Sequence, residues 1–82
     1  ELFDEFVKWL KEESGLSEST QKSIRKRTRL AHSIHRIENP NGYVEKLETK
    51  VRYKKLVDGV KPNVKYAVRL YFRFLEQRNQ SI

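Results

Sequence analysis

Apolar residues recur along this chain at the three- and four-residue spacing of amphipathic helices, and the pattern predicts four helical segments. The first covers Leu2–Ser14, where leucine and aromatic residues form one broad stripe. The second covers Ser17–Ile37 and opens on a serine suited to cap its first turn. A third begins near Tyr43, and the fourth covers Lys61–Arg78 with a proline in its first turn. No alternation of the β type occurs, so we expect an all-α bundle of four helices.

Turn residues separate these segments. Gly15 suits the left-handed conformation that closes a helix, and the run Glu38–Gly42 is the clearest break in the chain. The third segment is less regular than the others, because its apolar phase is lost after a first face comprising Val44, Leu47 and Val51. We therefore expect a bend or a new short turn near Arg52.

The second helix carries the strongest chemical signal, because the stretch Thr20–Ile37 holds six basic residues and no carboxylate. Soluble helices usually interleave both signs of charge, so this one-sided pattern favours contact with a polyanion, and nucleic acid is the first candidate. Arg27 lies within the apolar arc, and we expect it to extend its head to water or to pair with an acid of the first helix. The other five bases fall in one arc of roughly 100° opposite the apolar side: Lys22, Arg25, Lys26, Arg29 and Arg36.

The net charge of +7 over 82 residues is distributed unevenly. Residues 1–18 carry six acids and two bases, residues 19–37 carry six bases and no acid, and residues 59–82 carry five bases and one acid. The last helix presents Lys65, Arg69 and Arg73 along its polar side, with Glu76 on the same face. An acidic first helix beside two basic ones is typical of a polyanion-binding face, because two basic helices in a small bundle can straddle a phosphate backbone.

Other chemistries find little support in the sequence. The chain has no cysteine, which excludes disulfides and thiolate zinc sites, and no apolar run approaches the ~20 residues that span a membrane. His32 and His35 lack further ligands at metal-binding spacing, so we expect the first to be exposed and the second to line the core. Tyr66 is the only aromatic residue placed to stack on a base. We expect no catalytic residue, no metal and no cofactor.

Three motifs carry a family resemblance through their order and spacing: Phe3-x-x-Phe6-x-x-Trp9-Leu10, then Leu16-Ser17-Glu18-Ser19-Thr20-x-x-x-Ile24, then Val64-x-x-Ala67-x-x-x-Tyr71-Phe72-Arg73-Phe74-Leu75. Together they resemble the N-terminal core-binding domain of tyrosine recombinases (phage integrases) over essentially the whole chain. Two positions depart from the family pattern, since Ile24 replaces the usual aromatic residue and Val64 stands where tyrosine is frequent. Both remain apolar, and the segment from Tyr43 to Val57 matches poorly.

The resemblance implies a SAM-like four-helix bundle that forms one jaw of a C-shaped clamp around duplex DNA. The other jaw is a catalytic domain that holds the family's catalytic Arg, Lys, His and Tyr. Residues 1–82 are therefore expected to be a single core-binding domain, a fragment of a longer recombinase whose catalytic domain is absent here. The implied partners are double-stranded DNA, the catalytic domain of the same chain and other recombinase protomers on DNA. The implied location is the cytoplasm, at the nucleoid, for a prokaryotic or phage-encoded protein.

By position, the resemblance assigns DNA contacts to the starts of the second and fourth helices. The charge pattern extends this set, and the acidic first helix is expected to face away from DNA, toward solvent or a neighbouring protomer. Two alternatives remain open: a bundle whose basic face binds an acidic protein, and an RNA-binding helical module. The DNA contacts implied by position are Thr20, Lys22, Ser23 and Lys26 on the second helix and Lys61, Asn63 and Lys65 on the fourth, and the charge pattern adds Arg25, Arg29 and Arg69.

Overall fold

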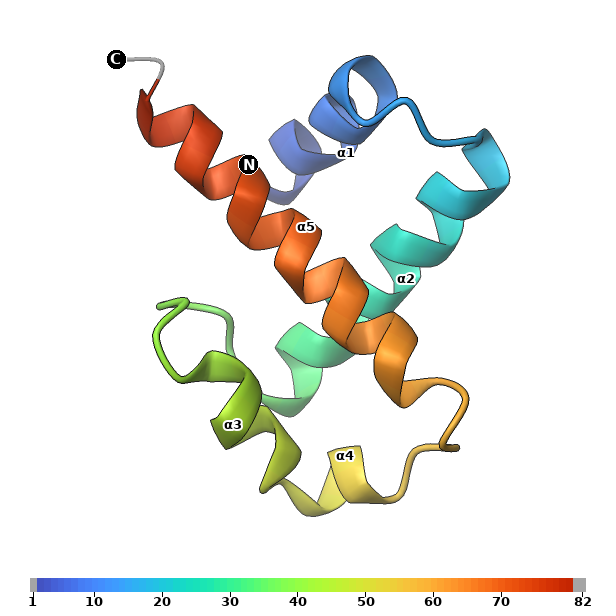
Figure 1. Cartoon of the computed structure of the whole chain (residues 1–82), viewed down its shortest axis with the longest axis vertical. Helices are drawn as coiled ribbons and strands as arrows, with labels where there is room; N and C mark the ends of the chain where they lie inside the picture. Colours follow the sequence, from blue (N-terminus) through green and yellow to red (C-terminus); the bar gives the residue numbers. More distant parts are fainter. Residues whose placement is uncertain (1, 81–82) are drawn as a thin grey trace.

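The computed structural model describes residues 2–80, and this part of the chain contains five helices and no strand (Figure 1). The all-α class is therefore confirmed. The segment after Tyr43 forms two short helices, so the described region has five helices where four were predicted. Within this region no helix combines the length and the apolar character needed to cross a membrane. The helices are α1 (Leu2–Glu13), α2 (Glu18–Ile34), α3 (Tyr43–Glu48), α4 (Val51–Lys54) and α5 (Lys61–Gln80).

The long helices α2 and α5 cross at the middle of the molecule and make its most extensive helix–helix contact (Figure 1). Helix α1 packs beside the C-terminal half of α5, while α3 and α4 lie at the opposite end of the structure. Each end has its own hydrophobic cluster, and α2 and α5 contribute to both. The α1 end buries Phe6, Leu10, Ile24, Ala67, Tyr71 and Phe74, and the α3–α4 end buries Ala31, Tyr43, Leu47, Tyr53, Val64 and Val68.

The apolar stripe predicted for the first helix is confirmed by Phe6 and Leu10, and the three- and four-residue apolar spacing of the last helix is confirmed by its buried residues in both clusters. The predicted face of the third segment is only partly correct. Leu47 is fully buried, but Val51 is 64% exposed. Helix α3 ends at Glu48 and α4 begins at Val51 on a new axis, so Val51 no longer shares a face with Leu47. The bend expected near Arg52 is confirmed, and it lies between the end of α3 at Glu48 and the start of α4 at Val51.

Local capping determines where α2 begins. The Oγ atom of Ser17 accepts a hydrogen bond from the backbone N–H of Thr20 at 3.3 Å, as expected for an N-cap residue. The same hydroxyl donates a hydrogen bond to Oγ1 of Thr20 at 2.9 Å. Thr20 occupies the position where a capping box would carry Glu or Gln. Gly15 adopts the predicted left-handed conformation, with φ of +70°, in the connection between α1 and α2.

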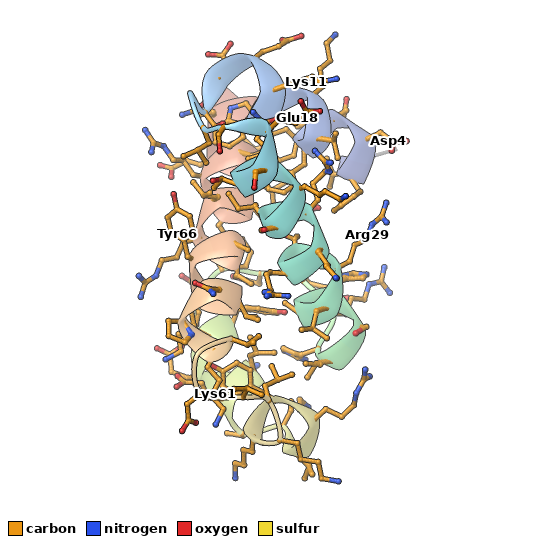
Figure 2. All side chains as sticks on the ribbon, turned by 90° about the vertical axis from the view of Figure 1, so that its right-hand side faces the viewer. Asp4, Lys11, Glu18, Arg29, Lys61 and Tyr66 are labelled. Atoms are coloured by element: carbon orange, nitrogen blue, oxygen red, sulfur yellow. The ribbon has the colours of Figure 1, made fainter. Side chains whose placement is uncertain are left out.

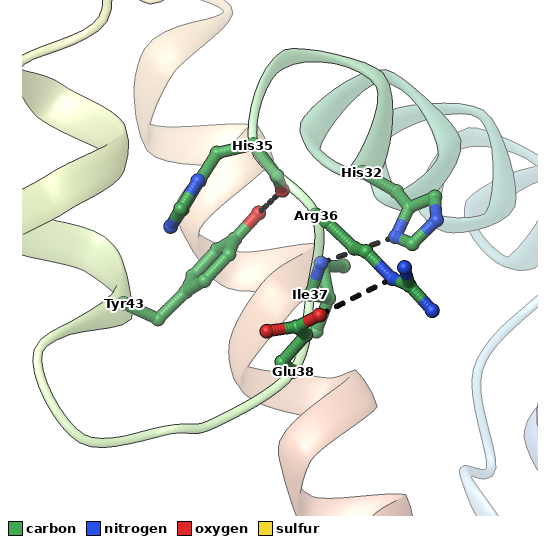
Figure 3. A network of polar contacts seen from close by, with 6 residues as sticks. All are labelled: His32, His35, Arg36, Ile37, Glu38 and Tyr43. Atoms are coloured by element: carbon green, nitrogen blue, oxygen red, sulfur yellow. Dashed lines mark hydrogen bonds and ion pairs between the residues drawn. The ribbon is translucent and has the colours of Figure 1, made fainter.

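Helix α2 ends at Ile34 and not at the predicted Ile37, and tertiary hydrogen bonds explain the difference (Figure 3). His35 is extended, and its carbonyl oxygen accepts a hydrogen bond from the Tyr43 hydroxyl at 2.7 Å. The backbone N–H of Ile37 donates to Nδ1 of His32 at 3.1 Å instead of to a helical carbonyl. The ring of His35 stacks on Tyr43, and His32 is exposed, so the predicted positions of both histidines are confirmed.

This earlier helix end corrects the predicted basic arc. Arg36 follows the C-cap residue His35 and therefore does not continue the helical stripe. Its Nε atom forms an ion pair with Oε1 of Glu38 at 3.4 Å. The stripe on α2 is limited to Lys22, Arg25, Lys26 and Arg29.

Tyr43 makes the free energy of unfolding sensitive to alkaline pH. Burial raises the pKa of Tyr43 from 10.0 to about 12. Because the folded-state pKa exceeds the unfolded one, the stability contributed by the neutral phenol is complete below pH 10.0 and is lost as the pH rises toward about 12. We expect the free energy of unfolding, measured by denaturant titration followed by circular dichroism, to fall across this range less steeply in Tyr43→Phe than in the wild type. An equally steep fall of the free energy of unfolding with pH in the wild type and in Tyr43→Phe would contradict the prediction.

Candidate nucleic-acid interface

The exposed side of α2 is a surface of cations that form no ion pair among the described residues. Lys22, Lys26 and Arg29 are exposed, and Arg25 is half-buried. None of the ion pairs within residues 2–80 involves any of these four side chains. The guanidinium of Arg29 lies 4.6 Å from the centroid of the Phe3 ring, which places it on the α1 side of the surface. We call these four residues the α2 cationic stripe.

Beside this stripe, a groove of about 270 Å³ runs between the N-terminal parts of α2 and α5. It brings together Thr20 and Ser23 from α2 and Asn63 from α5, the three uncharged side chains among the predicted contacts. Lys26 follows Ser23 by three residues and therefore lies on the adjacent side of the helix. Figure 2 shows α2 and α5 side by side, with Arg29 projecting from one flank of this view and Tyr66 from the other.

Arg27 and Tyr66 also line the α2–α5 groove, together with Ser19 and Ile24. Tyr66 is 45% exposed, so part of its ring faces solvent, as stacking on a base would require. Arg27 is half-buried, and its Nε atom is buried without a hydrogen-bond partner among the described residues. No acid of α1 pairs with it in this part of the chain, so that predicted alternative is wrong.

Arg27 is the residue of this groove that the sequence analysis did not count as a contact. Because it lies in the apolar arc, the sequence predicts that its head extends to water or pairs with an acid of the first helix. The signal that identifies it is its spacing of four residues after Ser23 and seven after Thr20, which places all three on one side of α2. An unpartnered guanidinium N–H is unfavourable in the free protein and leaves a donor for a ligand.

The basic residues of α5 lie in a different place. Lys61, Lys65 and Arg69 line a hollow of about 510 Å³ against the α3–α4 segment, separate from the α2–α5 groove. Two of the three already have carboxylate partners. The Nζ atom of Lys61 lies 3.3 Å from Oδ1 of Asp58, and that of Lys65 lies 3.0 Å from Oε2 of Glu48. The hydrogen bond to Glu48 is the main cause that raises the pKa of Lys65.

The predicted contacts therefore divide into three groups: the α2 cationic stripe, the α2–α5 groove, and the hollow lined by Lys61, Lys65 and Arg69, which we call the α4–α5 hollow. Three acidic residues of α1 lie at another part of the surface, where Glu5, Glu12 and Glu13 line a hollow beside the C-terminal end of α5. Asp4 is the exception, because it lines a hollow together with Arg29. There Glu5 forms an ion pair with Arg78 at 3.2 Å. Among residues 2–80, no three histidine or acidic side chains cluster as metal ligands would.

Comparison with known proteins adds no relative to this description. No protein-family model, no curated protein and no solved structure matches the chain.

Proposed function

We propose that this chain is a duplex-DNA-binding module whose binding face is the α2 cationic stripe together with the α2–α5 groove. The observation that carries the proposal is the placement of four cations without carboxylate partners beside a groove lined by hydroxyl, amide and guanidinium groups. Lysine and arginine contacts to phosphates supply most of the affinity of such a face, and polar side chains read base edges or fix the register. An α-helix also fits the width of the major groove.

Each group has a distinct role in this proposal. Lys22, Lys26 and Arg29 neutralise phosphates, because their charges are exposed along one side of α2. Thr20, Ser23 and Asn63 contact base edges or phosphate oxygens at the groove. Arg27 supplies guanidinium donors at the same place, where bidentate contact to guanine is the most frequent specific contact made by arginine.

The motif resemblance supports a finer version of the proposal. In this finer version, the helices form a SAM-like bundle, and the chain is part of a tyrosine recombinase whose catalytic residues lie in another domain. The helices that this family presents to DNA correspond to α2 and α5, and here these two helices line one groove. Lys61, Lys65 and Arg69 then act from the far side of α5, and the acidic α1 lies away from the DNA. Other protomers bound to the same DNA are the expected neighbours.

Binding is expected to depend steeply on salt. Roughly five to seven phosphate contacts give a slope near −5 when the logarithm of the binding constant is plotted against the logarithm of the salt concentration. The measurement is fluorescence anisotropy of a labelled DNA duplex titrated with the chain at several salt concentrations. An affinity independent of salt would contradict the proposal.

Two further titrations separate the alternatives. A structured RNA of the same length that binds more tightly than the DNA duplex would instead support the RNA-binding module. Failure to bind either nucleic acid at low salt, by protein shown to be helical by circular dichroism, would support a basic face for an acidic protein partner.

A further inference from the structure

The hollow between α4 and the start of α5 is lined by Tyr53, a residue whose hydroxyl is buried without a hydrogen-bond partner among residues 2–80. Tyr53 lines this hollow and is only 3% exposed. Its hydroxyl is buried and forms no hydrogen bond within the described part of the chain. A buried hydroxyl left in this state is unfavourable, and such groups are uncommon in native proteins. The hydroxyl is therefore a candidate donor for a ligand.

Basic side chains line the same hollow as Tyr53. The Nζ atom of Lys61 lies 5.9 Å from the centroid of the Tyr53 ring. Lys65 is one turn further along α5, and its pKa is raised first by the hydrogen bond to Glu48 and next by interaction with Tyr53. Lys65 and Tyr53 line the same hollow. Arg69, one turn further again, completes the lining on α5.

The acids that occupy these lysines are exchangeable. The side chain of Asp58 is fully exposed, and that of Glu48 is 44% exposed. Ion pairs in contact with water contribute little net free energy, so another anion can replace either carboxylate. An anion with several acceptor oxygens can bind both lysines and the buried hydroxyl at once, which a carboxylate held on one lysine does not do.

We infer that the α4–α5 hollow binds a phosphate group, with the Tyr53 hydroxyl as its buried donor and Lys61, Lys65 and Arg69 as its cations. Glu48 and Asp58 hold the lysines in the free protein and release them when phosphate binds. A free phosphate and a backbone phosphate of nucleic acid share this chemistry. The inference does not depend on DNA binding by the α2 cationic stripe, because the two surfaces are separate.

The test is calorimetric titration of the whole chain with inorganic phosphate, and separately with a DNA duplex, for the wild type and Tyr53→Phe. We expect this substitution to weaken phosphate binding by about tenfold or more, because hydrogen bonds to charged groups are among the stronger ones. It should leave the melting temperature of the phosphate-free protein unchanged or raise it, since the hydroxyl has no hydrogen bond to give up. A tyrosine with a purely structural role would show the opposite pattern, a lower melting temperature and an unchanged affinity.

Matched charge variants sharpen the result. Lys65→Gln should weaken phosphate binding, whereas Lys46→Gln, at an exposed position of α3 outside the hollow, should leave it unchanged. Glu48→Gln should strengthen it, because Lys65 is then released from its partner.

The two titrations also identify the source of the phosphate. Weaker binding of both inorganic phosphate and the duplex in Tyr53→Phe would assign the site to a backbone phosphate. Weaker binding of phosphate alone would assign it to a free phosphate or phosphomonoester. Equal affinities of wild type and Tyr53→Phe in both titrations would overturn the inference, and would leave DNA binding by the α2 cationic stripe to be judged by variants of Lys22 and Lys26.

Discussion

Replacing Lys22 and Lys26 together by glutamate is expected to reduce the affinity for a DNA duplex by on the order of a hundredfold, to the limit of detection at moderate salt. Both lysines are exposed on α2 and have no carboxylate partner among the described residues, so their charges are available to phosphates. The substitutions leave two phosphates without a neutralising cation and place two negative charges against the backbone. The slope of affinity against salt should also become shallower by about two, because each lysine accounts for about one unit of it. Fluorescence anisotropy at several salt concentrations measures both effects.

The matched control is Lys8→Glu/Lys11→Glu on α1. These lysines are also exposed, and the two double variants change the net charge by the same amount. We expect the control to lose much less affinity, because α1 lies outside the proposed binding face. If both variants lost affinity equally, binding would reflect net charge alone and the assignment of the face to α2 would be wrong. Circular dichroism of each variant checks that the helices remain formed.

Replacing Phe6 by alanine is expected to cause the largest loss of stability of any single substitution considered. Phe6 is fully buried, and its ring centroid lies 4.9 Å from that of Tyr71 in an edge-on arrangement and 5.5 Å from that of Phe74. Truncating a buried phenylalanine lowers the free energy of unfolding by about 3–5 kcal/mol. A domain of this size has roughly 4–12 kcal/mol in total, so the variant is expected to be close to unfolding at room temperature.

Thermal unfolding followed by circular dichroism should show this as a melting temperature lowered by roughly 15 °C or more. Tyr66→Ala is the matched aromatic control, because Tyr66 is 45% exposed and belongs to neither hydrophobic cluster. Its melting temperature should change by a few degrees at most. Similar effects of the two substitutions would show that the cluster around Phe6 does not support the fold as described.

The sequence predicts those parts of the fold that depend on local signals. The start of α2 follows from the capping chemistry of Ser17, and the buried faces of α1 and α5 follow from apolar periodicity. The end of α2 could not be predicted in the same way. It is determined by Tyr43, whose hydroxyl reaches the carbonyl oxygen of a residue eight positions earlier in the chain. A helix end held by a tertiary hydrogen bond leaves no local pattern.

The same distinction applies to the candidate site. The exposure of Lys22 and Lys26 follows from their positions opposite the apolar side of α2, and sequence reasoning found them. The separation of Lys65 from the α2–α5 groove could not be found, because it depends on how α5 packs against the α3–α4 segment. The same holds for Tyr53, since it lies on a helix of four residues that no periodicity defines.

The presence of α2 and α5 in both hydrophobic clusters has a consequence for how the proposed face meets DNA. If α1 separates from one end, or α3 and α4 from the other, the remaining cluster still holds the two long helices together. The segments that carry the binding face are therefore the last expected to lose their order when the domain opens locally. A face that is already ordered loses little conformational entropy on association. In the complex it is then mainly the DNA that changes shape. Because the stiffness of DNA depends on its sequence, this deformation becomes a source of selectivity among DNA sequences.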